Sequence, residues 1–148
     1  MAAAPPGWLG AYRRYLTAAA AGHLAWETLQ LPLYTIWAEA PMPRLAWAVL
    51  HCTAGDIAIA TASLSLALAL LASPQWPAFR YRRVATAAIA IGVAYTVYSE
   101  WLNTTVRKDW AYAAAMPVLG PLGTGLAPLL QWVVVPAVAF LAAKPRNV

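Results

Sequence analysis

The chain has 148 residues, of which 62% are hydrophobic and 10% are charged, with a formal net charge of +5 and a mean hydropathy of +0.59. Soluble domains average about 45–50% apolar and about 25% charged residues, so this composition excludes an ordinary soluble protein and predicts an integral membrane protein. The single cysteine, Cys52, excludes an intramolecular disulfide. The basic residues lie in short groups at the ends of apolar stretches, a pattern that indicates membrane topology and no nucleic-acid partner.

Four apolar stretches are long enough to cross a bilayer, which requires about 20 residues per helix. The first covers residues 9–37, the second 45–71, the third 84–102 and the fourth 126–143. The remaining length leaves room for short connections but for no separate soluble domain. The sequence therefore predicts an all-α membrane protein, with residues 1–148 forming a single four-transmembrane-helix bundle.

The connections between these stretches are marked by proline and glycine. Ala-Pro-Met-Pro at 40–43 and Ser-Pro-Gln-Trp-Pro at 73–77 are expected to end one helix and start the next. Proline lacks the amide proton and restricts the residue before it, so it interrupts helices. Residues 103–125, rich in both residue types, are expected to form an ordered loop or a broken helix over one mouth of the bundle.

Lysine and arginine are divided unevenly between the two sides of this topology. The side of the chain ends carries Arg13, Arg14, Arg80, Arg82, Arg83, Lys144 and Arg146, and the opposite side carries Arg44, Arg107 and Lys108. By the positive-inside rule both termini are cytoplasmic.

A signal peptide is not expected, because His23 and Glu27 interrupt the first apolar stretch. The alanine-rich composition favours a bacterial protein, and hence the bacterial cytoplasmic membrane. An aromatic belt is expected from Trp8 and Trp76 at the inner interface and from Trp37, Trp47 and Trp110 at the outer one.

Five acidic or histidine side chains lie inside the predicted spans. Three of the five acidic residues, Glu27, Asp56 and Glu100, are there, together with both histidines, His23 and His51. A charge within a membrane helix costs about 2.5–3.5 kcal/mol, so such residues usually face the bundle interior and mark a functional site. We expect His23, Glu27, Asp56 and Glu100 to be the catalytic group.

Helical spacing predicts which side chains share a pocket in the outer half of the bundle. His23, Glu27, Gln30 and Tyr34 recur every three or four residues and fall on one face of the first helix. His51 and Asp56 are roughly 140° apart around the second helix, so they cannot both point to one spot without a bend. The residues expected to bind substrate are Trp26, Gln30, His51, Tyr95, Asn103, Gln131 and Trp132. Single amides such as Gln30, Asn103 and Gln131 also serve as hydrogen-bonding contacts between membrane helices.

Buried carboxyls suggest acid–base chemistry on an apolar substrate. A carboxyl in a low-dielectric pocket can stay protonated and donate its proton to a carbon–carbon double bond, while a second carboxylate or imidazole removes a proton elsewhere. The rings of Trp26, Tyr95 and Trp132 could stabilise the intervening carbocation, although simple packing explains them equally well.

Four short segments resemble, in order and spacing, the four-helix EXPERA superfamily, which includes the emopamil-binding sterol isomerase and the sigma-2 receptor. They are His23-Leu-Ala-Trp-Glu27, the acidic residue of the second span, Tyr95-Thr-Val-Tyr-Ser-Glu100 and Gln131-Trp-Val-Val-Val-Pro136. The resemblance implies a proton-handling pair at His23 and Glu27, a second-helix acid at Asp56, and a pocket floor at Gln131 and Trp132. Because Gln131 stands where the family usually has asparagine, and because the loops are shorter, a terpenoid or other lipid is expected in place of a sterol.

Two other classes of function remain open at this stage. His23 and His51 could bind haem or a transition metal, whereas the isomerase interpretation requires no cofactor. The same carboxylates could serve as relays in a small proton-coupled transporter, although four helices without an internal repeat would make a small one. The expected partners are the bilayer and a hydrophobic small molecule or lipid, and the bundle could also pair as a homodimer.

Overall fold

The computed structural model describes residues 7–72 and 75–144, which are mostly helical. The elements follow the order α1 (Trp8–Gln30), η1 (Leu31–Leu33), α2 (Ile36–Glu39), α3 (Met42–Leu71), α4 (Tyr81–Trp101), η2 (Leu102–Val106), β1 (Val118–Leu119), β2 (Thr124–Gly125) and α5 (Leu126–Ala143). The η1 element is a single 3-10 turn and η2 is a π-helical turn, while β1 and β2 form a short antiparallel hairpin.

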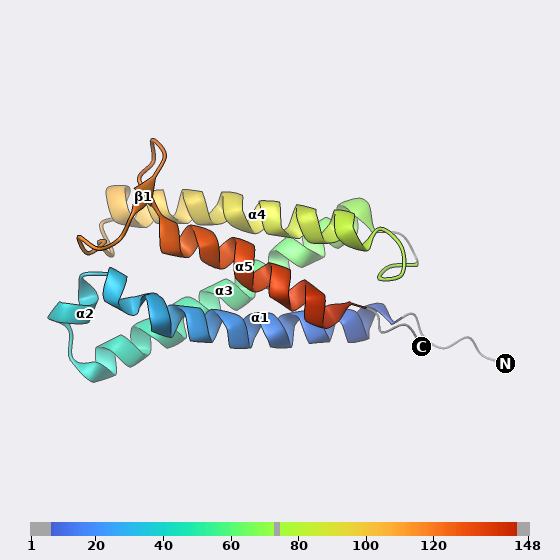
Figure 1. Cartoon of the computed structure of the whole chain (residues 1–148), viewed down its shortest axis with the longest axis horizontal. Helices are drawn as coiled ribbons and strands as arrows, with labels where there is room; N and C mark the ends of the chain where they lie inside the picture. The colour runs from blue at the N-terminus through green and yellow to red at the C-terminus, as the bar shows by residue number, and fades with distance from the viewer. Residues whose placement is uncertain (1–6, 73–74, 145–148) are drawn as a thin grey trace.

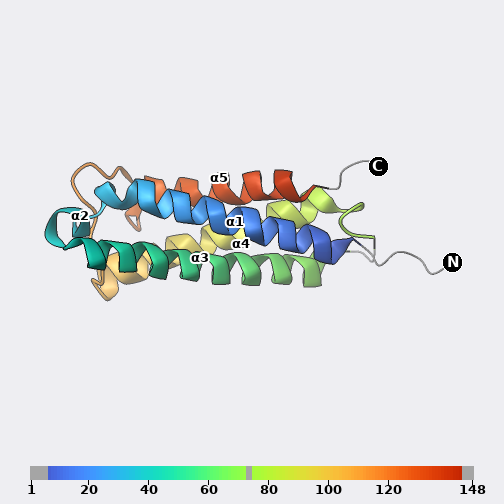
Figure 2. The ribbon, with the colours of Figure 1, turned by 90° about the horizontal axis from the view of Figure 1, so that it is seen from below.

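The four long helices lie alongside one another (Figures 1 and 2). Helix α1 packs against α3 and α5, and α4 packs against the same two helices. The start of α1 and the end of α5 lie at one end of the bundle, and α2 and the β1–β2 hairpin lie at the other. Two connecting segments, between α1 and α3 and between α4 and α5, therefore cover the same end.

An apolar core that includes Tyr15, Leu64 and Phe140 is buried, but burial departs from that of a soluble protein in two ways. Large apolar side chains are exposed, as Leu29 (80%) and Leu141 (73%) illustrate. The buried polar side chains are His23, Glu27, Gln30, Thr53, Asp56, Ser63, Thr96, Glu100, Asn103, Thr124 and Gln131. Buried polar groups and exposed large apolar groups are the informative departures from ordinary folding. Two helices, α3 and α5, are long and apolar enough to cross a membrane.

Glycine allows α5 to approach two neighbouring helices closely. A Cβ atom at Gly22 would lie 2.7 Å from Val135 Cγ1, and one at Gly92 would lie 2.3 Å from Trp132 Cε3. Both distances are shorter than van der Waals contact. The absence of a side chain at Gly92 thus lets the Trp132 indole lie flat against α4, as small residues do at helix contacts in membrane proteins.

The helix bounds differ from the predicted spans mainly in the first helix. An α-helix over 9–37 was expected, but α1 ends at Gln30 because Pro32 follows and cannot supply the next amide proton. Helix α3 starts after Pro41, within the predicted turn. Helix α5 has the bounds expected for the fourth span. Part of the predicted turn at 73–77, Arg146 and both chain ends lie outside the described residues.

The chain between α4 and α5 folds back over the end of the bundle. Lys108 has a left-handed backbone (φ 60°), and the Asp109 amide donates to the Asn103 carbonyl at 2.9 Å, which reverses the chain after η2. Tyr112 then forms an antiparallel bridge with Tyr34 of the first connection. The two connections are joined by the Thr35 amide, which donates to the Ala111 carbonyl at 3.0 Å. The predicted loop over the mouth of the bundle takes this form.

Candidate functional site

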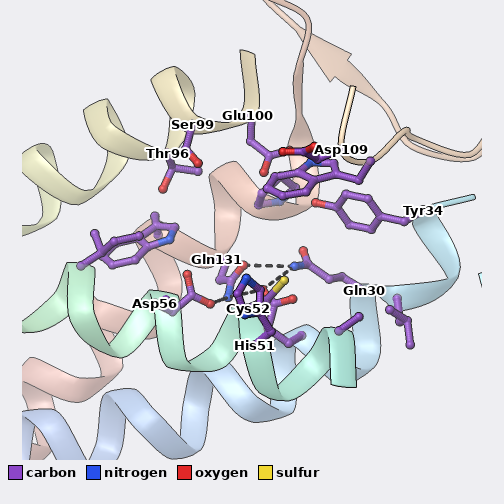
Figure 3. Close-up of a pocket in the computed structure, with 18 of the residues that line it drawn as sticks. Gln30, Tyr34, His51, Cys52, Asp56, Thr96, Ser99, Glu100, Asp109 and Gln131 are labelled. Atoms are coloured by element: carbon purple, nitrogen blue, oxygen red, sulfur yellow. Dashed lines mark hydrogen bonds between the residues drawn. The ribbon is translucent and has the colours of Figure 1, made fainter. Parts of the chain in front are cut away.

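A cavity of about 380 Å³ lies between the four long helices, beneath the two connections (Figure 3). Small-molecule sites are usually clefts of about 300–1,000 Å³. Eight of the eleven predicted site residues line it, and they are Glu27, Gln30, His51, Asp56, Tyr95, Glu100, Gln131 and Trp132. Three buried carboxyls, from α1, α3 and α4, therefore face one space.

Gln131 lies at the centre of the polar network. Its Nε2 atom is 3.0 Å from Glu27 Oε1, 2.9 Å from Asp56 Oδ2 and 3.0 Å from His23 Nδ1. Gln30 Nε2 donates to Glu27 Oε1 at 2.8 Å and to Gln131 Oε1 at 3.2 Å. An amide nitrogen carries only two protons, so the three acceptors around Gln131 share them. One glutamine thus joins α1, α3 and α5.

His23 lies behind this network and not on the cavity. The side chain is fully buried and its ring is 4.9 Å from that of Trp132. Its Nδ1 atom is 3.5 Å from Asp56 Oδ2, and its Nε2 atom has no hydrogen-bond partner among the described residues. His23 can therefore influence the carboxyls through Asp56 and Gln131, but it does not line the space that a ligand would occupy.

Glu100 stands on the opposite wall of the cavity, on α4 with Thr96 and Ser99 (Figure 3). The Tyr112 hydroxyl donates to Glu100 Oε2 and accepts a hydrogen bond from the Gly125 amide at 2.9 Å. Burial, followed by the hydrogen bond to Glu100 and its charge, raises the pKa of Tyr112 above its ordinary range. The phenol therefore keeps its proton and remains a donor to Glu100.

Several buried polar atoms on the cavity wall have no partner among the described residues. They are Gln30 Oε1, Thr96 Oγ1 and Trp110 Nε1. A buried polar group left without a hydrogen bond costs about 1–3 kcal/mol, so a polar group brought by a ligand would be favoured here. The acidic side chains of the lining are Glu27, Asp56, Glu100 and Asp109, and no lysine or arginine lines the cavity within the described residues.

The cavity opens between α3 and α4. Apart from Asp109 in the second connection, the exposed lining residues all lie on these two helices. Trp47 is 67% exposed and Tyr95 is 47% exposed, and the exposed His51 ring stacks on Trp47 at 5.9 Å. The entrance is therefore on the side of the bundle, bordered by aromatic rings.

Three predicted site residues lie outside the lining, and Trp26 and Asn103 make hydrogen bonds to the protein itself. Trp26 Nε1 donates to the Ala127 carbonyl at 3.2 Å and thereby joins α1 to the start of α5. Asn103 Nδ2 donates to the Ser99 carbonyl at 2.8 Å within the π-helical turn. The third is His23, described above. Ligand contact is thus not the role that the geometry gives these side chains.

The two histidines do not converge on a common point. His23 is enclosed behind Gln131, whereas His51 stands at the exposed entrance. Within residues 7–72 and 75–144, no group of three or more His, Cys, Asp or Glu side chains is arranged to hold a metal ion. Joint ligation of haem or a metal by this pair would require a rearrangement of the helices.

Some lining residues were not among the predicted set. Tyr34, Trp110 and Cys52 line the cavity. Tyr34 had been placed on the polar face of the first helix by its spacing but was not named among the site residues. Trp110 had been assigned to a membrane interface from its position near a span end, as had Trp76, which is only 3% exposed. Both assignments rested on position alone, whereas Trp76 is buried and Trp110 is half-buried with its Nε1 atom enclosed.

No protein-family model, curated protein or solved structure matches this chain. The functional assignment therefore depends on the chemistry of the cavity. Asp56 faces Glu100 across the cavity (Figure 3), and Glu27 shares the Gln131 amide with Asp56. An acid and a base could therefore act on opposite sides of a bound molecule.

Proposed function

We propose that this protein is a four-helix protein of the bacterial cytoplasmic membrane that binds a small lipid or isoprenoid in its cavity. We further propose that it acts on that molecule by proton transfer, as an isomerase of carbon–carbon double bonds similar to the EXPERA enzymes. The observation that carries the proposal is the meeting of Glu27, Asp56 and Glu100 in one cavity that opens on the side of the bundle. Neither step requires a cofactor.

The membrane assignment is supported by the exposed large apolar side chains and the buried carboxyls. Helices α1 and α4 turn Glu27 and Glu100 inward, while apolar residues cover the outside. Exposed apolar surface of this extent marks a membrane or protein contact. Ionisable residues in membrane helices face the bundle interior for the same reason, because lipid cannot solvate them.

The ligand class is supported by the shape and chemistry of the cavity. An opening between α3 and α4 would face lipid, so an apolar molecule could enter from the bilayer past Trp47 and Tyr95. The acidic lining without lysine or arginine favours a ligand that develops or carries positive charge. The Trp132 ring, buried at the cavity wall, is suited to stabilise such a charge.

The proposed reaction conserves atoms and electrons. A protonated carboxyl of the Glu27 and Asp56 pair gives its proton to one carbon of the double bond. The adjacent carbocation then loses a proton from a neighbouring carbon to a carboxylate, for which Glu100 stands on the opposite wall. The double bond moves by one position and no oxidant or reductant is consumed.

Mass spectrometry of the purified protein tests this proposal. We expect a hydrophobic molecule to co-purify in mild detergent at a ratio near one per chain, and Asp56→Asn to reduce its amount. The same sample is examined by visible absorption and metal analysis. A Soret band or stoichiometric metal, or the absence of any bound hydrophobic molecule, would contradict the proposal.

Thiol labelling tests the proposed orientation. In a Cys52→Ala background, Glu39→Cys is expected to react with a membrane-impermeant thiol reagent added outside the cell, because Glu39 lies exposed at the end opposite the start of α1 and the end of α5. Arg82→Cys, exposed at the start of α4, serves as the matched control and should react only after the membrane is opened. The reverse pattern would place the cavity toward the cytoplasm.

A further inference from the structure

Tyr112 does not line the cavity, yet its side chain contacts one of the residues that does. Its hydroxyl donates to Glu100 Oε2 and accepts from the Gly125 amide. With Glu100 ionised the direction is fixed, because a carboxylate can only accept and the phenol has a single proton to give, while the Gly125 amide can only donate. Glu100 therefore accepts this hydrogen bond through Oε2, on a side chain that lines the cavity.

The Tyr112 ring is held tightly in this position. A Cβ atom at Gly125 would lie 3.0 Å from two ring carbons, so the ring lies directly against the backbone that starts α5. On its other side the ring centroid is 5.5 Å from that of Tyr34. The Ala113 amide also donates to the Leu33 carbonyl at 2.9 Å, which fixes the backbone on both sides of Tyr112 together with the Thr35 bond.

We propose that Tyr112 is a positioning residue that holds Glu100 against the cavity wall and, through the same hydroxyl, fastens residues 107–125 over the end of the bundle as a lid. The hydroxyl joins α4, through Glu100, to the lid at two points, Tyr112 itself and Gly125 at the end of the lid. A ligand group or proton that occupies Glu100 Oε2 competes with Tyr112 for the same lone pairs. Filling of the site and loosening of the lid are thereby coupled. The inference rests on the proposed function in one respect, namely that Glu100 faces the ligand.

The native cysteine makes the lid measurable without knowledge of the ligand. Cys52 is the single cysteine of the chain and lines the cavity. In lipid nanodiscs, a charged methanethiosulfonate reagent must pass the lid to reach it. The membrane-soluble reagent N-ethylmaleimide can instead enter between α3 and α4. The ratio of the two modification rates therefore reports the state of the lid.

Removal of the Tyr112 hydroxyl is expected to open the lid. We predict that Tyr112→Phe raises the rate of modification by the charged reagent about tenfold, which corresponds to one lost hydrogen bond to a charged group. The rate with N-ethylmaleimide should stay unchanged. Tyr98→Phe is the matched control, because Tyr98 is 52% exposed on the same helix as Glu100 and outside the cavity lining. It should behave like the parent with both reagents.

A double-mutant cycle separates positioning from a general structural effect. Glu100→Leu should open the lid as far as Tyr112→Phe, and the double variant should be no more open than either single one. Glu100→Gln keeps an oxygen that accepts the Tyr112 proton, so it should retain most of the closure. An unchanged rate in Tyr112→Phe, additive effects in the double variant, or equal opening by Glu100→Gln and Glu100→Leu would each overturn the proposal.

The result can be told apart from the test of the proposed function. Unchanged labelling in Tyr112→Phe, with the hydrophobic molecule still bound to the parent, would contradict the proposed role of Tyr112 and leave the proposed function intact. The predicted labelling in a protein that binds no hydrophobic molecule would contradict the proposed function and support the role of Tyr112 in closing the lid.

Discussion

Replacement of Glu27 by glutamine is expected to abolish turnover of the bound molecule, or to weaken strongly the binding of a cationic analogue, while the protein stays folded. Glutamine keeps the size of the side chain and an oxygen that can accept the bonds from Gln30 and Gln131, now at 2.8 and 3.0 Å. It cannot transfer a proton or balance a positive charge. General acid–base catalysis contributes about 10²–10⁴-fold to rate, and this is the expected loss.

Turnover is to be measured on the co-purified molecule, once identified, by following the position of its double bond. Asp56→Asn and Glu100→Gln should also impair the reaction, and His23→Ala should do so indirectly through Gln131 and Asp56. Glu39→Gln is the control, because that carboxyl is exposed in α2. A folded Glu27→Gln variant with parental activity would show that the buried acids have a structural role only.

The polar face of the first helix was predictable because it depends on local periodicity. His23, Glu27 and Gln30 are spaced so that they fall on one side of any α-helix, and the structure buries all three. The rotation between His51 and Asp56 was predictable for the same reason. Asp56 is buried in the network and His51 is exposed at the entrance. For residues within a regular helix, the spacing in the sequence thus predicts which face of the helix each side chain lies on.

The roles of Trp110 and Tyr112 were not predictable in this way. Both lie in the connection before α5, where the backbone follows no fixed period. Their positions depend on a reversal after η2 and on the bridge between Tyr34 and Tyr112, which are 78 residues apart. Such pairings between distant segments leave no spacing pattern to read. Sequence reasoning could identify the carboxyl of Glu100 but not the phenol that holds it.

Whether a side chain reaches the cavity was also harder to predict than the face of the helix on which it lies. His23 and Trp26 were assigned to the pocket because they share the first helix with Glu27, yet His23 is covered by Gln131 and Trp26 bonds to the Ala127 carbonyl. The covering residues come from α5, so the outcome depends on how closely two helices approach. That approach is set by Gly22 and Gly92, whose missing side chains admit Val135 and Trp132.

Gly92→Ala should therefore destabilise the protein and displace Trp132 from the cavity wall. The added Cβ would lie 2.3 Å from one ring carbon of Trp132 and 2.5 Å from another, and the buried indole could relieve this contact only by moving into the cavity that it lines. Overpacking of this kind costs about 1–3 kcal/mol. The variant is expected to unfold at a lower temperature in detergent, and its tryptophan fluorescence should change.

Gly55→Ala is the matched comparison, because both glycines lie within long helices and gain the same methyl group. A Cβ at Gly55 meets nothing within 4 Å, so the substitution removes only the conformational freedom of glycine. It should leave stability unchanged or raise it by about 0.4–1 kcal/mol. A lower unfolding temperature for Gly92→Ala and an unchanged or higher one for Gly55→Ala would show that the destabilisation comes from the contact with Trp132. Equal shifts would mean that a Cβ atom at Gly92 does not clash with Trp132, and hence that α4 and α5 lie further apart than the 2.3 Å contact between that Cβ and Trp132 Cε3 implies. Trp132 would then have room to leave the cavity wall, and its role in stabilising a cation there would lose its support.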